Sequence, residues 1–417
     1  MKLAALPTEL IDAISEHLEL RDQLLLCRTS CHMHAICVKW IYRVLDFENH
    51  IQLLRCCKAI ITRPQAAMSV REFKIPNLRC PTYALKSFFT IFRSAATRMQ
   101  NLRSIDIRSP ELFRTISDVV FPCLVDCIIP LALDSYSFLR RNPTIEYAFT
   151  FPASSQDTEF ILNNPSHTEP IHMPHLQHFE GPEIAVCAVV PGSPVSTLTI
   201  WCPDPVMEYS RGLTAAASSK ADLRILTNII RSWDPALLRA IAKHTPRIQF
   251  LKIRNPIVSS SITEKENFLF AIGNTLRALS CLVALIVSDN TAVHPDRIGD
   301  ALESEFERVR TWGDRCPTLV RVSSLSLSRA WGRFGALWLP VEYINESERV
   351  QCLKWLIKRI VISPELHPEY REVASSLVGA DGIQVLADAF RQGEVLPLFD
   401  ISPMGDGRVV ILFPSDP

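Results

Sequence analysis

Residues 6–47 read LPTELIDAISEHLELRDQLLLCRTSCHMHAICVKWIYRVLDF and predict three short helices. The first begins at Pro7, because proline is tolerated in the first turn of a helix. Its apolar residues recur at helical spacing and are Leu10, Ile11, Ile14 and Leu18. Its wet face is expected to carry Glu9, Asp12, Ser15 and Glu16. Asp22 and Ser30 can cap the second and third helices, whose apolar residues exceed what so small a core can hide. Part of this apolar surface is therefore expected to face a partner or the following domain.

The same stretch resembles the F-box, the motif that docks substrate receptors onto the Skp-type adaptor of SCF ubiquitin ligases. The resemblance is carried by Leu6-Pro7-Thr8-Glu9-Leu10, by Asp22-Gln23-Leu24-Leu25 and by the ending Trp40 to Phe47, which is similar to that of fungal-type F-box proteins. Ser30 is followed by Cys31, so the basic residue usual at this point of the motif is missing. The resemblance covers about a tenth of the chain.

The resemblance implies an adaptor interface and, through the adaptor, a cullin scaffold. The residues that would line or support this interface are Leu6, Pro7, Leu10, Ile14, Leu18, Leu24, Leu25 and Trp40. The alternative is that they are ordinary core residues of an N-terminal helical cap.

The composition excludes several classes of partner. The 417 residues carry 44 Lys plus Arg and 44 Asp plus Glu, so no net charge attracts nucleic acid or an anionic membrane. No apolar run approaches the ~20 residues of a membrane-spanning helix, and the N-terminus does not read as a secretory signal. The 13 cysteines are scattered and are expected to be small buried hydrophobes. We expect a cytoplasmic or nuclear protein.

Two clusters invite a metal interpretation and neither fits it. The first holds Cys27, Cys31, His32, His34 and Cys37, which form one dense group rather than the separated pairs of a zinc site. The second holds His167, His172, His175 and His178 in a proline-containing segment without cysteine. The sequence therefore predicts no metal and no cofactor.

From about residue 99 the chain alternates short apolar strands with amphipathic helices. The clearest predicted strands are Leu102 to Ile107, Leu124 to Ile129, Val195 to Ile200, Ile248 to Ile253 and Leu282 to Val287, with poorer copies at Leu176 to Phe179 and Leu319 to Leu327. The steps from Leu102 to Leu124 and from Leu124 to Ile145 fit the 20–29-residue period of leucine-rich repeats. Asn290 completes that consensus in one copy, and the other copies lack the asparagine.

Four apolar stripes predict helices between these strands. The first stripe is Leu85, Phe88, Phe89, Phe92, Ala96 and Met99, and the second is Leu223, Leu226, Ile229, Ile230 and Trp233. The third is Phe268, Ile272, Leu276 and Leu279, and the fourth is Ile298, Leu302, Phe306, Val309 and Trp312. Alternating strands and helices favour parallel strands with crossover helices, hence a degenerate leucine-rich-repeat-like solenoid. A non-repetitive α/β domain is the alternative.

The predicted fold class is mixed α/β. We expect an F-box-like helical module at 1–47, a helical connector at 48–98, the repeat domain at 99–343 and a helical cap and tail at 344–417. Near the end of the repeats, Trp331, Phe334, Trp338 and Pro340 are expected to close the open core, although exposed tryptophans would instead suit substrate binding. The tail predicts helices near 349–361 and 382–391 and a strand from Val409 to Phe413.

The sequence predicts a receptor rather than an enzyme, with no catalytic residues of its own. It contains no G-x-S-x-G, G-x-x-x-x-G-K, G-x-G-x-x-G or H-E-x-x-H motif. We therefore expect a substrate-recognition subunit of an SCF-type ubiquitin ligase, with an unknown protein as its substrate. The alternatives are a protein-interaction scaffold outside any ligase and an enzyme with an unrecognised site in residues 80–417.

Overall fold

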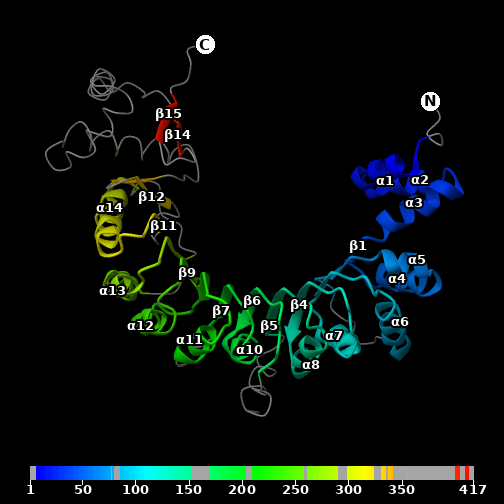
Figure 1. Cartoon of the computed structure of the whole chain (residues 1–417), viewed down its shortest axis with the longest axis horizontal. Helices are drawn as coiled ribbons and strands as arrows, with labels where there is room; N and C mark the ends of the chain where they lie inside the picture. Colours follow the sequence, from blue (N-terminus) through cyan, green and yellow to red (C-terminus); the bar gives the residue numbers. More distant parts are fainter. Residues whose placement is uncertain are drawn as a thin grey trace. The chain divides into compact units, whose positions relative to one another are not determined.

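The chain is described by a computed structural model that covers residues 6–76, 78, 85–152, 170–202, 209–257, 261–289, 298–323, 330–334, 337–340, 355, 400–403 and 409–412. It divides into two compact units, residues 1–201 with 211–223, and residues 202–210 with 224–417. In both units helices alternate with strands, and most strands pair in parallel (Figure 1). The predicted mixed α/β class is therefore confirmed. Within the described ranges, no helix has the length and apolarity needed to cross a membrane.

The first unit opens with three helices and continues with seven parallel strands. Its helices are α1 Thr8–His17, α2 Leu20–Cys27, α3 Cys31–Ile41, α4 His50–Thr62, α5 Pro64–Ser69, α6 Lys86–Ala96, α7 Pro110–Ile116, α8 Leu133–Arg141, α10 Glu183–Val189 and, but for its first residue, α11 Ser210–Ala217. Its strands are β1 Val44–Asp46, β2 Glu72–Ile75, β3 Ser104–Ile107, β4 Asp126–Leu131, β5 Tyr147–Pro152, β6 His178–Pro182 and β7 Thr197–Trp201. Each strand pairs with the next in chain order, so the strands follow one another as repeats.

A single hydrogen-bond motif recurs where most of the described parallel strands begin. The carbonyl of Arg43 accepts from two successive amides, those of Arg71 and Glu72 at 2.9 and 3.0 Å. The Arg71 carbonyl accepts in the same way from Arg103 and Ser104. The motif continues in the first unit through the carbonyls of Arg103, Val125, Glu146 and Gln177, and recurs in the second through those of Arg224, Gln249 and Val283. We call this series the carbonyl ladder. It satisfies backbone groups that burial would otherwise leave unpaired, and it fixes the register of each pair.

An apolar residue lies just before most strands and is fully buried. Leu102, Leu124, Leu282 and Leu319 are each no more than 1% exposed, yet none is part of a strand. The predicted strands therefore exist but begin about two residues later than the first leucine of each pattern. These leucines are buried in the turn that precedes each strand. The apolar pattern alone does not distinguish such a residue from the first residue of a strand.

The second unit continues the same alternation. Its strands are β8 Ile225–Ile229, β9 Phe250–Asn255, β10 Ala284–Asp289, β11 Arg321–Ser323, β12 Ala330–Phe334 and β13 Leu337–Pro340, and its helices are α12 Pro235–His244, α13 Ile262–Thr275 with the short 3₁₀ turn η3 Leu276–Ala278, and α14 Ile298–Arg315. The strands from β8 to β11 are parallel, and β11 to β13 are antiparallel. A separate antiparallel pair, β14 Asp400–Pro403 and β15 Val409–Leu412, includes the predicted C-terminal strand.

The predicted helix along Leu223, Leu226, Ile229, Ile230 and Trp233 is wrong. Residues 225–229 form strand β8, in which Leu226 and Asn228 are fully buried while their neighbours are exposed or half-buried. Burial thus alternates with the period of a strand, and the helix begins only at Pro235. The other three predicted stripes coincide with α6, α13 and α14, although Leu85 lies before α6 and is 73% exposed.

The aromatic cluster after β11 closes the core of the second unit. Trp331 and Trp338 are 0% and 2% exposed, so the alternative of two exposed tryptophans is wrong. Trp331 packs against Phe306 and Trp355, with ring centroids 6.0 and 5.4 Å away, and its indole N–H donates to Glu305 at 3.1 Å. Strand β12 pairs with β11 in antiparallel orientation, and β13 pairs with β12. These strands therefore supply the hydrogen bonds that a further parallel strand would otherwise make with the edge of β11.

The predicted boundaries at residues 47 and 98 do not coincide with breaks in the sheet. Strand β1 lies before the first boundary, and β2 lies inside the segment predicted to be a helical connector. Of the helix predicted near 349–361 only Trp355 is described, and it is helical; the helix predicted near 382–391, Asn290 and His167 lie outside the described residues.

Two buried asparagines of the second unit provide a test of its packing. Asn228 and Asn255 are both 0% exposed, but the Asn228 amide has no hydrogen-bond partner among the described residues. The Asn255 Oδ1 accepts from the amide of Ile257 at 2.9 Å. We expect Asn228→Leu to be neutral or to stabilise by about 1 kcal/mol, and Asn255→Leu to destabilise by about 1–3 kcal/mol. Urea unfolding of both variants measures this, and equal destabilisation would contradict it.

Candidate functional site

Helices α1 to α3 form a small unit around a core of three side chains. Ile11, Met33 and Ile36 are buried together, with Leu6 and Leu26 packed against them. The Ser30 hydroxyl caps α3 by accepting from the Met33 amide at 3.2 Å, as predicted. The predicted cap at Asp22 is wrong, because α2 begins at Leu20 and places Asp22 inside its first turn. A core of this size leaves most of the leucines of the unit outside it.

Five large aliphatic side chains of α1 and α2 are exposed to solvent. They are Leu10, Ile14, Leu20, Leu24 and Leu25, with exposed fractions from 43% to 58%, and we call them the exposed aliphatic set. Leu10 and Ile14 are one helical turn apart on α1, and Leu20 and Leu24 are one turn apart on α2. Exposed apolar residues gathered in so short a segment are typical of a surface that binds another protein.

The residues predicted to form an interface divide into two groups in the structure. Pro7, Leu10, Ile14, Leu24 and Leu25 are exposed, whereas Leu6, Leu18 and Trp40 are half-buried. Leu20 belongs to the exposed aliphatic set but was missed by the motif comparison, although its apolar side chain at the start of α2 was a usable signal.

Trp40 joins α3 to α1 rather than pointing freely into solvent. Its indole N–H donates to Asp12 Oδ1 at 2.7 Å, and Asp12 Oδ2 accepts from Lys39 Nζ at 2.5 Å. The Lys39 ammonium and the Arg43 guanidinium lie 5.1 and 4.7 Å from the indole ring. Trp40 therefore fixes the position of α1, which carries two members of the exposed aliphatic set.

A buried polar network fixes α2 against α1. Gln23 Nε2 donates to the carbonyls of Ser15 and Leu18 at 2.9 and 3.0 Å, close to the end of α1. Ser15 is 0% exposed, and its hydroxyl donates to the Ile11 carbonyl at 2.7 Å. The placement of Ser15 on the wet face is therefore wrong: the hydroxyl is satisfied within its own helix, so it can face the core while Ile14 faces solvent. Gln23 is a positioning residue that the motif comparison did not single out.

The cysteine and histidine cluster of this unit does not assemble into a ligand set. Cys37 is 0% exposed, and the histidines at 32 and 34 are exposed. Burial, followed by the neighbouring Cys37, raises the pKa of Cys27 to about 11. Throughout the part of the chain that the structure describes, no three His, Cys, Asp or Glu side chains converge to hold a metal ion.

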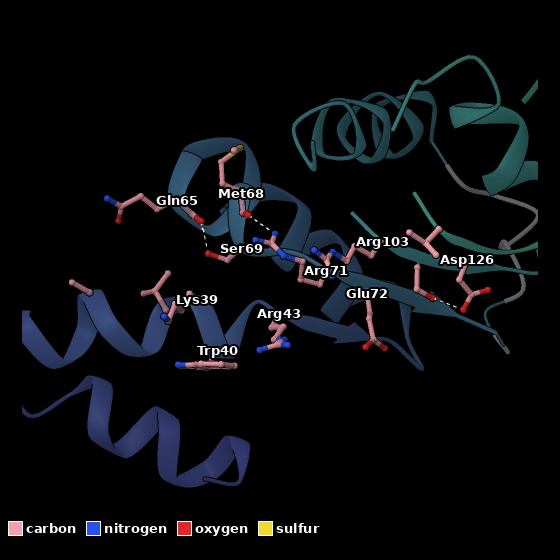
Figure 2. A pocket seen from close by; sticks show the side chains of 14 residues that line it. Lys39, Trp40, Arg43, Gln65, Met68, Ser69, Arg71, Glu72, Arg103 and Asp126 are labelled. Carbon is pink, nitrogen blue, oxygen red and sulfur yellow. Dashed lines mark hydrogen bonds between the residues drawn. The ribbon is translucent and has the colours of Figure 1, made fainter. Parts of the chain in front are cut away.

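A groove of about 890 Å³ lies between the three-helix unit and the start of the sheet (Figure 2). It is lined by α3, by α5 and by the first residues of β2 to β4, including Lys39, Trp40, Arg43, Arg71, Glu72, Arg103 and Asp126. Its four cations and two carboxylates offer no single charge for a ligand to match. We read the groove as the joint between the two parts of this unit. Helices α3 and α5 contact one another beside it.

Comparison with protein-family models finds no match, and a search of curated proteins finds none either. The function of the chain is therefore argued from its own residues.

The Asp12 cluster makes the packing of α1 on α3 sensitive to acid. Burial raises the pKa of Asp12, but hydrogen bonds from Lys39 and Trp40 outweigh it and hold the pKa below the ordinary 3.8. A lowered pKa in the folded state stabilises the fold above the ordinary pKa, and this contribution is lost as the pH falls through the folded pKa. We expect the indole N–H resonance of Trp40 to shift below about pH 4. An Asp12→Asn control should lack that shift, and the same titration in both proteins would contradict the assignment.

Proposed function

We propose that the chain is a substrate-recognition subunit of an SCF-type ubiquitin ligase. In this proposal α1 to α3 are an F-box that docks on the Skp-type adaptor, and the adaptor connects the chain to a cullin scaffold. The strands and helices that follow are degenerate leucine-rich repeats that bind the protein substrate. The observation that carries the proposal is the exposed aliphatic set, which occupies the segment whose sequence resembles the F-box.

The exposure of these side chains supports docking over a purely structural cap. If α1 to α3 only covered the end of the sheet, their leucines would be expected to face the core that they cover. Instead Ile11, Met33 and Ile36 fill the core, while Leu24 and Leu25 are about half exposed. Because these five side chains are already about half covered, burying the rest against a partner contributes roughly 1 kcal/mol each, before the cost of association.

The link between the helical unit and the sheet favours a tether over a flexible tail. Arg43, which follows α3 and Tyr42 directly, provides the first carbonyl of the ladder. Leu45 and Phe47 are each 7% exposed, and the Phe47 ring lies 5.8 Å from that of Phe73 on β2. Phe73 in turn lies 5.9 Å from Phe92 of α6. A receptor that raises the effective concentration of its substrate near an enzyme needs such a firm connection.

The chain performs no chemistry in this proposal. Its mechanism is to hold a bound protein near a ubiquitin-loaded enzyme at the far end of the complex. A scaffold outside any ligase would use the same surfaces without the adaptor, so adaptor binding separates the two functions.

Substitutions on the exposed aliphatic set test the proposal. We expect the double variant Leu24→Asp, Leu25→Asp to lose co-purification with the Skp-type adaptor by at least about tenfold, because charged groups replace apolar contacts. The measurement is the adaptor recovered per molecule of chain from cells in which both are expressed. Both leucines are about half exposed, so the fold should be retained.

The matched control is Ile262→Asp at the first residue of α13, because Ile262 is 80% exposed and lies outside the helical unit. It should bind the adaptor as the parent chain does. Equal adaptor recovery with the double variant and the parent would contradict the proposal. Deleting residues 1–47 is a poorer test, because it would also remove β1 and the first carbonyl of the ladder.

A further inference from the structure

In the described part of the first unit, helices cover one face of the sheet and leave the other face open. The covered face is marked by Phe73, Ile105, Cys127, Ala148, Phe179 and Leu198, which are paired across neighbouring strands and no more than 2% exposed. Helix α7 contacts β3 and β4, α8 contacts β4, and α10 contacts β6 and β7. Because side chains alternate along a strand, the residues between these buried ones point to the opposite face.

The open face of β5 to β7 carries an aromatic patch. We define it as Tyr147, Phe149, Phe151 and Trp201, all of which are half-buried. The Phe149 ring lies 5.9 Å from that of Phe151 and 5.3 Å from that of Trp201, so Phe149 lies at the centre of the patch. Tyrosine and tryptophan on an exposed face are the side chains most enriched at energetically dominant points of protein interfaces.

Two carboxylates border the aromatic patch. Glu180 lies on β6 opposite Phe149, and its Oε1 accepts from the Trp201 indole N–H at 3.1 Å. Asp126 lies on β4 opposite Tyr147; its Oδ1 is buried without a hydrogen-bond partner among the described residues, and its Oδ2 accepts from the Ser104 hydroxyl at 3.1 Å. Burial raises the pKa of the Tyr147 hydroxyl, and the charges of Glu180 and Asp126 raise it further. Both carboxylates therefore lie on the same face of the sheet as the patch, Asp126 on β4 and Glu180 on β6, on either side of β5.

Lysine and arginine are missing from this part of the sheet, and its one base is His178 on β6, whose ring lies 6.3 Å from that of Tyr147. Strands β4 to β7 contain no Lys or Arg, and the cation whose charge acts on Asp126 is Lys74, already paired with Glu72 at 2.6 Å. Arg43, Arg71 and Arg103 lie at the starts of the neighbouring strands β1 to β3 and line the groove described above. The open face therefore carries both acidic and basic residues at β1 to β3, whereas at β4 to β7 it carries acidic and aromatic residues.

We propose that the aromatic patch, with Asp126 and Glu180, binds a basic segment of a protein through its arginine or lysine side chains. An aromatic face attracts a cation through the electron density of its rings, and the Glu180 carboxylate supplies the opposite charge beside it, while the buried Asp126 carboxylate adds to the negative potential. Asp126 also lines the groove that holds Arg43, Arg71 and Arg103, whose charges disfavour the same ligand on the side of β1 to β3. That the ligand is a substrate rests on the proposed function. If the chain is a substrate receptor, the basic segment belongs to the protein that it presents for ubiquitination.

The test uses the full chain and fluorescein-labelled synthetic peptides as probes. These are (Arg-Gly)6, (Gln-Gly)6 and (Glu-Gly)6, with binding followed by fluorescence anisotropy at 0.15 M salt. We expect (Arg-Gly)6 to bind and the other two peptides to bind at least about tenfold more weakly. Equal binding of the arginine and glutamine peptides, or tighter binding of the glutamate peptide, would overturn the proposal.

Glu180→Gln assigns the binding to this face. The glutamine retains an oxygen that can accept from the Trp201 indole but removes the charge, so we expect (Arg-Gly)6 to bind about 3- to 10-fold more weakly while the fold is kept. The control Glu264→Gln makes the same change of charge on the exposed first turn of α13 and should bind as the parent does. Unchanged binding by Glu180→Gln would overturn the assignment.

Phe149→Ala is a second variant whose effect does not depend on charge. It should weaken (Arg-Gly)6 binding by a similar factor, and binding equal to that of the parent would also overturn the proposal. The adaptor-binding double variant at Leu24 and Leu25 should bind the peptide normally. Failure of the peptide test and failure of adaptor docking are thus separate results.

Discussion

The carbonyl ladder is the interaction on which the architecture of each unit depends. One carbonyl at the start of a strand accepts two successive amides from the next strand, and this happens at Arg43, Arg71, Arg103 and each later repeat in which the bonds are described. Parallel strands place their helices on the same face only while this register is kept. The length of the connecting segment is then free to vary, which explains why the repeats tolerate unequal spacing. The ladder begins at Arg43, so the three-helix unit is joined to the sheet by main-chain bonds.

The three-helix unit combines a firm attachment with an exposed apolar surface. Gln23 and Trp40 use directional hydrogen bonds to orient α2 and α1, where a larger unit would use apolar packing. The leucines that would otherwise pack into a larger core therefore remain at the surface. Exposed apolar area of this kind favours aggregation unless a partner covers it, so its presence is itself an argument for docking. The open face of β4 to β7 is a second surface, chemically distinct because it is aromatic and acidic.

The sequence predicted part of the elements and not where they begin. Helical spacing identified α13 and α14, and apolar runs identified β3, β4, β6, β7 and β9 to β11 but not β1, β2, β5 or β8. The fully buried Leu102 and Leu282 lie in the turns before β3 and β10. The apolar residues of 223–233 fit the period of a helix and also that of a strand. Only the structure shows that burial alternates along 225–229 and includes Asn228, which identifies the segment as a strand. In the candidate site, Leu10, Ile14, Leu24 and Leu25 were identified through the motif. Leu20 and Gln23 were not identified. The inward direction of the Ser15 side chain could not be predicted, because a hydroxyl satisfied within its own helix has no signature in the sequence.

The central claim is that α1 and α2 meet the adaptor while the strands remain available for another protein. Hydrogen exchange of the full chain, with and without purified Skp-type adaptor, measures this directly, because amides covered by a partner exchange more slowly. The account predicts slower exchange in residues 8–27 and unchanged exchange in β5 to β7 and in β9 to β10. Protection confined to the strands, or no protection of residues 8–27 at a saturating concentration of adaptor, would contradict it.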